Sequence, residues 1–98
     1  MMVNEKVLKF DANKDVEEIR FNHWIIKKES YARLNKGLQK GLFEMTIRQV
    51  EEDLGVTFGR ARGLIKKFEE LGIIKVQKRA KLKVEVSIYS YEYTNDNK

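Results

Sequence analysis

The chain has 98 residues, of which 42% are hydrophobic and 36% charged, so we expect one small folded domain rather than two domains or a disordered chain. It has no cysteine and a single histidine, which excludes disulfides, thiolate zinc sites, cysteine nucleophiles and histidine-dependent triads. We therefore expect no enzymatic activity, no metal and no cofactor, and the net charge of +5 favours a polyanion as partner.

Apolar residues do not form a membrane-spanning or signal segment, because the longest uninterrupted apolar run has three residues, 24–26. We expect no membrane association and a location in the bacterial cytoplasm or nucleoid. Residues 1–14 form an N-terminal segment whose structure the sequence leaves open, either a short strand or a segment that packs on the domain. Residues 15–93 are expected to form the domain, and residues 94–98 a flexible tail.

A long first helix is predicted from Asp15, its N-cap, to the residue before Gly37, with Glu17 and Glu18 in the first turn. The residues expected to form its apolar face recur at roughly helical spacing: Val16, Ile19, Trp24, Ile26, Tyr31 and Leu34. Phe21 and Ile25 widen this face, so the helix is expected to contact two neighbouring elements or another subunit.

A short strand at 42–45 precedes a capping box, in which Thr46 and Gln49 begin a second helix that ends at Gly55. Thr57 is expected to cap a third helix that ends at Gly72. The apolar residues of this third helix follow the i, i+3, i+4, i+7 pattern: Ala61, Leu64, Ile65, Phe68 and Leu71. Two helices joined by a Gly-Val-Thr turn form a helix-turn-helix unit.

A β-hairpin is predicted after the third helix, with a basic tip at 77–81. One buried face is expected from its alternating apolar residues: Ile74, Val76, Leu82, Val84, Val86 and Ile88. Tyr89, Tyr91 and Tyr93 alternate too, and are expected on one strand face at the core edge or in a dimer contact. The fold class is thus α+β, in the winged helix-turn-helix order: long first helix, short strand, helix-turn-helix and C-terminal hairpin wing.

The positive charge is concentrated in one segment of the sequence. Residues 57–83 contain nine basic and two acidic residues, a net charge of +7, whereas the rest of the chain has eleven basic and thirteen acidic residues, a net charge of −2. A segment of one sign attracts and steers a partner of the opposite sign. The third helix and the hairpin tip are therefore predicted to bind a polyanion.

Four segments resemble the N-terminal winged-helix domain of DnaD-like phage and plasmid replication proteins, the replisome organisers: KGLF at 40–43, TIRQVEEDLGVT at 46–57, RARGLIKKFEELGII at 60–74 and VSIYSYEY at 86–93. The resemblance extends over 21–93. It implies DNA binding during replication initiation, oligomerisation through this domain and contacts with replication proteins. Glu51 departs from the small residue that helix-turn-helix units usually have at its position.

Duplex DNA is the predicted partner, with the third helix in the major groove. The predicted contacts are Thr57, Gly59, Arg60, Arg62, Gly63, Lys66, Lys67, Lys78, Arg79, Lys81 and Lys83. Arg60 and Arg62 are the candidates for reading bases, since a guanidinium pairs bidentately with guanine, and the lysines and Arg79 are candidates for phosphate contacts. Gly59 and Gly63 suggest a close backbone approach to DNA or a neighbouring helix, or neutral drift.

Several alternatives remain open from the sequence. The same fold and contacts also suit a transcriptional repressor. A winged helix used for protein assembly alone is a different class, in which the first helix and the Tyr-rich last strand form a homodimer or a higher oligomer. RNA is a weaker alternative because no stacking platform is visible. Phe58 either packs against the first helix, the favoured alternative, or is an exposed wedge.

Overall fold

The order of elements along the chain is helix, strand, two helices and two further strands. The computed structural model describes residues 3–94. Its elements are a 3-10 helix η1 (Glu5–Lys9), α1 (Val16–Lys36), β1 (Leu42–Met45), α2 (Ile47–Leu54), α3 (Phe58–Glu70), β2 (Ile74–Lys78) and β3 (Ser87–Tyr91). The predicted α+β class is confirmed, and of the predicted flexible tail, residues 95–98 lie outside the described part of the chain.

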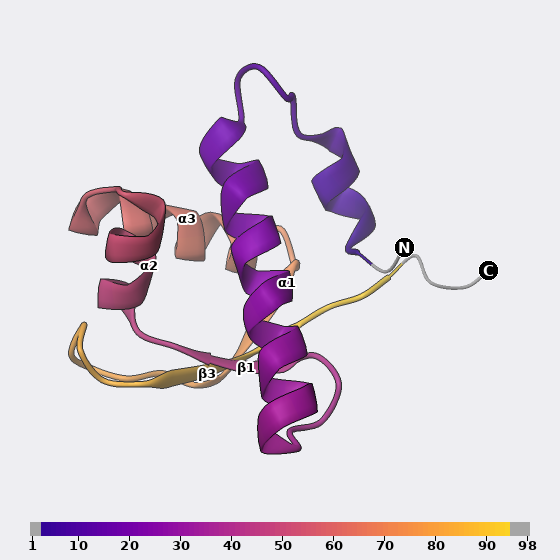
Figure 1. Cartoon of the computed structure of the whole chain (residues 1–98). Helices are drawn as coiled ribbons and strands as arrows, with labels where there is room; N and C mark the ends of the chain where they lie inside the picture. The colour runs from indigo at the N-terminus through magenta and orange to yellow at the C-terminus, as the bar shows by residue number, and fades with distance from the viewer. Residues whose placement is uncertain (1–2, 95–98) are drawn as a thin grey trace.

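The three strands form an antiparallel sheet in the order β1-β3-β2, so the last strand is central. Phe43 of β1 and Val76 of β2 both pair with Tyr89 of β3. Helix α1 crosses the sheet, and α2 and α3 lie together at one end of it (Figure 1). A single core joins these layers through buried residues from every one of them: Phe21, Ile25, Phe43, Met45, Val50, Leu54, Ala61, Leu64, Ile65, Phe68, Ile73, Ile74, Tyr89 and Tyr91.

The local signals for the helix ends are confirmed. The Thr46 hydroxyl accepts a hydrogen bond from the Gln49 amide at 3.0 Å, and the Gln49 side chain accepts one from the Thr46 amide at 3.1 Å. Gly37 and Gly55 end α1 and α2 in the left-handed conformation that glycine adopts without strain. Asp15 differs from its prediction: its carboxylate accepts from the Asp11 amide at 2.8 Å instead of capping α1.

We expect Thr46→Ala to lower the free energy of unfolding by about 1 kcal/mol, because it removes the hydroxyl that caps α2. Helix α2 has only 8 residues, so it depends on its cap and its packing more than a longer helix does. Urea denaturation at neutral pH measures the change. Thr46→Ser retains the hydroxyl and should preserve most of the stability; equal losses in both variants would contradict the capping role.

The buried face of α1 only partly matches the prediction. Phe21 and Ile25 are buried as predicted, and Trp24 and Ile26 pack against the core. Val16, Tyr31 and Leu34 are exposed. The residues that α1 buries are Glu18, Phe21, Asn22, Ile25, Glu29 and Ala32. Glu18, Asn22 and Glu29 interrupt the apolar pattern of the face that contacts the core, which is why apolar periodicity also included exposed positions. Within residues 3–94, no helix combines the length and apolar content needed to cross a membrane.

The hairpin also differs from its prediction. Leu82, Val84 and Val86 are 61%, 54% and 49% exposed, because they belong to the loop before β3 rather than to a strand. In β3 the buried side is formed by Ser87, Tyr89 and Tyr91, so the tyrosines face the core. The predicted buried face of the hairpin is therefore confirmed for Ile74 and wrong for Val76, Leu82, Val84 and Val86, and the prediction that the tyrosines pack at the core is confirmed for Tyr89 and Tyr91.

The N-terminal segment, left open from the sequence, packs on the rest of the domain. Asn4 is buried; its amide donates to the Tyr91 hydroxyl at 3.1 Å, and its side chain donates to the Glu92 carbonyl at 2.7 Å. Phe10 follows η1, and its ring stacks on Phe68 with a centroid distance of 5.8 Å. This segment therefore packs against the C-terminal part of α3 and the C-terminal end of β3.

Candidate nucleic-acid interface

A groove of about 1030 Å³ lies between α3 and the loop that joins β2 to β3. We call it the basic groove. Its lining residues come from β1, α2, α3, the loop and β3: Met45, Ile47, Phe58, Arg62, Gly63, Ile65, Lys66, Glu69, Glu70, Arg79, Ala80, Lys81, Lys83, Ser87 and Tyr89. Several of the predicted DNA contacts are thus brought together, although they come from elements separate in the sequence.

Three cations of the basic groove have no carboxylate partner among the described residues: Arg62, Lys66 and Lys81. Arg62 lies over the ring of Phe58, with its guanidinium carbon 5.7 Å from the ring centroid. Phe58 is partly exposed at the groove, so it is not enclosed in the core as the favoured alternative required. These side chains can meet an anion without first giving up an ion pair.

The loop between β2 and β3 is fastened to the start of α2. The amide of Arg48 donates to the carbonyl of Lys83 at 3.2 Å, which satisfies a donor that the first turn of a helix leaves unpaired. The ammonium of Lys83 lies 3.5 Å from the Glu51 carboxylate and 5.1 Å from the Phe58 ring centroid. Lys83, predicted as a phosphate contact, therefore holds the loop, and Glu51 has a partner that its position in the sequence did not reveal.

Arg79, also predicted as a phosphate contact, is paired within the groove. Its guanidinium forms two hydrogen bonds with the Glu69 carboxylate, at 2.8 and 3.2 Å. These bonds raise the pKa of Arg79. The Tyr89 hydroxyl lies 3.4 Å from the same carboxylate, and burial together with the Glu69 charge raises the pKa of Tyr89 to about 12. Arg79 thus joins the loop to α3. Because its charge is already paired with Glu69, it attracts a polyanion less than an unpaired arginine does.

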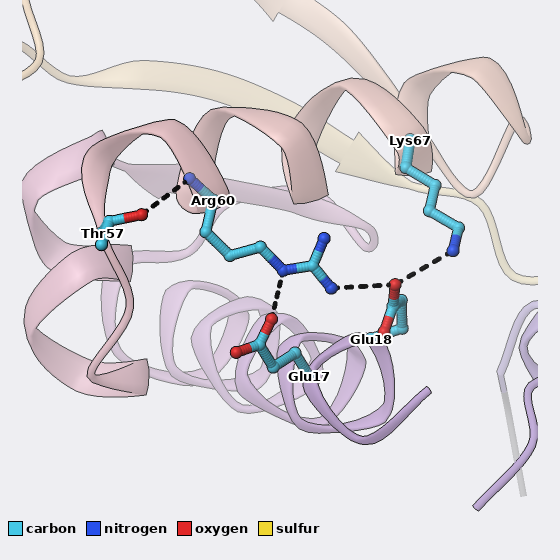
Figure 2. A network of polar contacts seen from close by, with 5 residues as sticks. All are labelled: Glu17, Glu18, Thr57, Arg60 and Lys67. Atoms are coloured by element: carbon cyan, nitrogen blue, oxygen red, sulfur yellow. Dashed lines mark hydrogen bonds and ion pairs between the residues drawn. The ribbon is translucent and has the colours of Figure 1, made fainter. Parts of the chain in front are cut away.

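Arg60 and Lys67 point away from the basic groove, toward the first turn of α1 (Figure 2). Arg60 bonds to the carboxylate of Glu17, and it donates to Glu18 at 3.1 Å. Lys67 donates to Glu18 at 3.0 Å, and its ammonium lies 5.6 Å from the centroid of the Phe10 ring. Arg60 was predicted to read bases and Lys67 to contact phosphates; the structure places both in an intramolecular network instead.

The carboxylate of Glu18 is ionised in this network. Burial raises the pKa of Glu18, but the hydrogen bonds from Lys67 and Arg60 outweigh this effect, so its pKa lies below the ordinary value. The hydrogen bond that Arg60 donates to Glu17 likewise raises the pKa of Arg60. Two carboxylates and two cations thus form a neutral cluster between α1 and α3. No sequence pattern indicates it, since each carboxylate is more than 40 residues from the cation it pairs with.

Of the remaining predicted contacts, Gly63 lines the groove, and Thr57, Gly59 and Lys78 do not. The Thr57 hydroxyl accepts from the Arg60 amide at 3.1 Å and so caps α3. Gly59 and Gly63 face open space: apart from its chain neighbours and the nearby backbone of α3, a Cβ atom added at either position would meet no described atom within 4 Å, so no other described helix approaches them. Lys78 lies on β2, outside the groove lining. Arg48 pairs with Glu52 at 3.9 Å.

The structure shows which of the basic residues in 57–83 are compensated by nearby carboxylates. Of the nine basic residues in 57–83, four pair with described carboxylates, three of which lie outside that segment: Glu17, Glu18 and Glu51. Five have no such partner among residues 3–94: Arg62, Lys66, Lys75, Lys78 and Lys81. The uncompensated charge is therefore on the groove side of α3, the loop and β2, and not along the whole of α3.

Comparison with known proteins does not test the resemblance to DnaD-like domains, which stays a prediction from the quoted segments. The basis for a functional proposal is therefore the basic groove and the partners of its residues. No protein-family model, curated protein or solved structure matches this chain.

Proposed function

We propose that this chain is a winged-helix domain that binds duplex DNA through the basic groove and the exposed residues of α3 beside it. The observation that carries the proposal is the convergence of Arg62, Lys66 and Lys81 on one groove, without carboxylate partners among the described residues. The lining has five basic residues against Glu69 and Glu70, and an excess of positive charge on one surface is the electrostatic footprint of a nucleic-acid-binding domain.

The order of the elements supports the winged-helix part of the proposal. Helix, strand, two helices and a two-stranded unit follow one another, and β1 pairs with the last strand to complete the sheet. Helices α2 and α3 are joined by the short turn at Gly55 and contact each other, as in a helix-turn-helix unit. The 79–86 loop would be the wing, although its anchoring by Lys83 holds it close to α2.

Arg62 has the principal role in this proposal. It is exposed on the groove side of α3, and its guanidinium can form bidentate hydrogen bonds with guanine O6 and N7. Lys66 and Lys81 supply phosphate contacts, which set affinity and register. The bare backbone at Gly59 and Gly63 allows α3 to approach DNA closely.

The biological setting is the second part of the proposal. The resemblance to DnaD-like domains supports a role in replication initiation in a phage or plasmid, with replication proteins as further partners. A transcriptional repressor would use the same contacts. Genome-wide occupancy distinguishes the two roles, since binding clustered at an origin supports replication and binding clustered at promoters supports repression.

A salt titration of binding to random-sequence duplex DNA tests the proposed function. The logarithm of the association constant should fall linearly with the logarithm of the salt concentration. On random sequence Arg62 has no fixed guanine to pair with and contacts a phosphate as Lys66 and Lys81 do, so the slope should be about −2.7 or steeper. The oligomeric state is measured by light scattering in the same buffers. A protein that oligomerises but shows no duplex binding at low salt would be an assembly module instead, and the DNA-binding proposal would be wrong.

A further inference from the structure

Helix α3 carries its cations in two rows. Arg62 and Lys66, four residues apart, line the basic groove. Arg60 and Lys67, seven residues apart, lie on another side, where they meet the first turn of α1 (Figure 2). Both rows lie on a helix proposed to contact DNA, but only the first is uncompensated. The difference between the rows comes from two carboxylates of α1.

These two carboxylates are not equivalent. The side chain of Glu18 is 6% exposed and lies between Arg60 and Lys67, whereas the side chain of Glu17 is 38% exposed and bonds to Arg60 alone. Glu18 is thus part of the packing between α1 and α3. Glu17 lies at the rim of the cluster, so it can be neutralised without leaving a buried charge unpaired.

The contacts at Arg60 oppose the approach of a phosphate. Its Nε and Nη2 donors are directed at Glu17 and Glu18, so a phosphate that binds this guanidinium must displace a carboxylate or accept two negative charges beside it. Lys67 is held by Glu18 and lies over Phe10, so it does not move independently of the cluster.

We infer that Glu17 limits polyanion binding by withholding Arg60 from the partner of the basic groove. This inference rests on the proposed function, and it adds a residue of α1 that determines which cations of α3 a nucleic acid meets. When Glu17 is neutral, Arg60 keeps its bond to Glu18, and its bond to residue 17 loses the charge that strengthens it, so a phosphate can displace that bond more easily. The number of phosphate contacts then rises by one.

The test compares Glu17→Gln with Glu5→Gln. Both variants remove one exposed or partly exposed carboxylate and raise the net charge by the same amount, but Glu5 forms no side-chain hydrogen bond or ion pair among the described residues. Glu17→Gln should elute from immobilised heparin at higher salt than Glu5→Gln. It should also bind duplex DNA about 3- to 10-fold more tightly at 0.1 M salt, with a slope steeper by about 0.9. Thermal unfolding followed by circular dichroism checks that both variants are folded.

Arg60→Gln in the wild-type and Glu17→Gln backgrounds completes the cycle. The substitution should change binding little in the wild type and should abolish the gain of Glu17→Gln. Equal heparin elution of Glu17→Gln and Glu5→Gln, or a gain that persists without Arg60, would overturn the inference. If no variant binds duplex DNA, the proposed function fails, and the heparin comparison still decides whether Glu17 withholds Arg60 from a polyanion.

Discussion

Glu29→Gln is expected to lower the free energy of unfolding by about 3 kcal/mol, the cost of breaking charged hydrogen bonds at a buried group. The Glu29 side chain is fully buried in α1. Its two oxygens accept from Arg33 at 3.0 and 3.3 Å, from the Gly41 amide at 2.8 Å and from the Tyr93 hydroxyl at 2.7 Å. Each oxygen of Glu29 accepts from two of these four donors, so the NH₂ group of a glutamine would face two donors.

The pH dependence of stability should change with the same substitution. Burial raises the pKa of Glu29, but the bonds from Arg33, Gly41 and Tyr93 outweigh it, so the folded-state pKa lies below 4.5. A depressed pKa contributes stability that is complete above about pH 4.5 and is lost as the pH falls through the folded-state value. The wild type should therefore lose more stability between pH 5 and pH 2 than Glu29→Gln.

Urea denaturation at several pH values measures both effects. Glu44→Gln is the matched control, because Glu44 pairs with Lys36 at 2.8 Å on the surface and the change of charge is identical. Its expected cost is below about 1 kcal/mol. Equal stability of the two variants at neutral pH would show that Glu29 does not hold α1 to the end of the sheet.

Neutralising the three unpaired groove cations is expected to weaken duplex binding about 100- to 1,000-fold at 0.1 M salt, since each phosphate contact releases about 0.9 counterion. The variant is Arg62→Gln, Lys66→Gln and Lys81→Gln. Its salt slope should be shallower by about 2.7 for the same reason. Stability should change little, because none of the three side chains has an ion-pair partner among the described residues.

The control carries the same change in net charge on another surface. Lys9, Lys14 and Lys27 are exposed and line neither the basic groove nor the cluster around Glu18. Replacing these three by glutamine should reduce duplex affinity much less than replacing the groove cations. Fluorescence anisotropy with one labelled duplex measures both variants. Similar losses in the two triple variants would mean that net charge, rather than the basic groove, determines binding.

Features set by neighbours in sequence were predictable. The capping box of Thr46 and Gln49, the glycine ends of α1 and α2 and the buried face of α3 depend on residues one to seven positions apart, so they leave a local pattern. The α+β class follows from such elements. Arg62, Lys66 and Lys81 belong to the one basic segment of the sequence and line one groove, while their contact with DNA stays a prediction.

Features set by distant pairs were not predictable in the same way. Asn22 meets Tyr91, 69 residues later, and Glu29 meets Tyr93, 64 residues later. These pairs place polar residues on the buried face of α1, where an apolar pattern is expected. Arg60 likewise resembles any exposed arginine until Glu17, 43 residues earlier, is seen beside it. The net charge counted along the sequence was therefore larger than the unpaired positive charge on the surface of α3.

The position of β2 in the sheet has a consequence for aggregation. Because the strand order is β1-β3-β2, one edge of β2 has no neighbouring strand among the described residues and could template pairing with another chain. Lys75 and Lys78 lie on this strand, without carboxylate partners among residues 3–94, and a bulge interrupts its register between Val76 and Lys78. Charged lysines and bulges both discourage edge-to-edge association. Two cations outside the basic groove thus protect the sheet from growing into an intermolecular one.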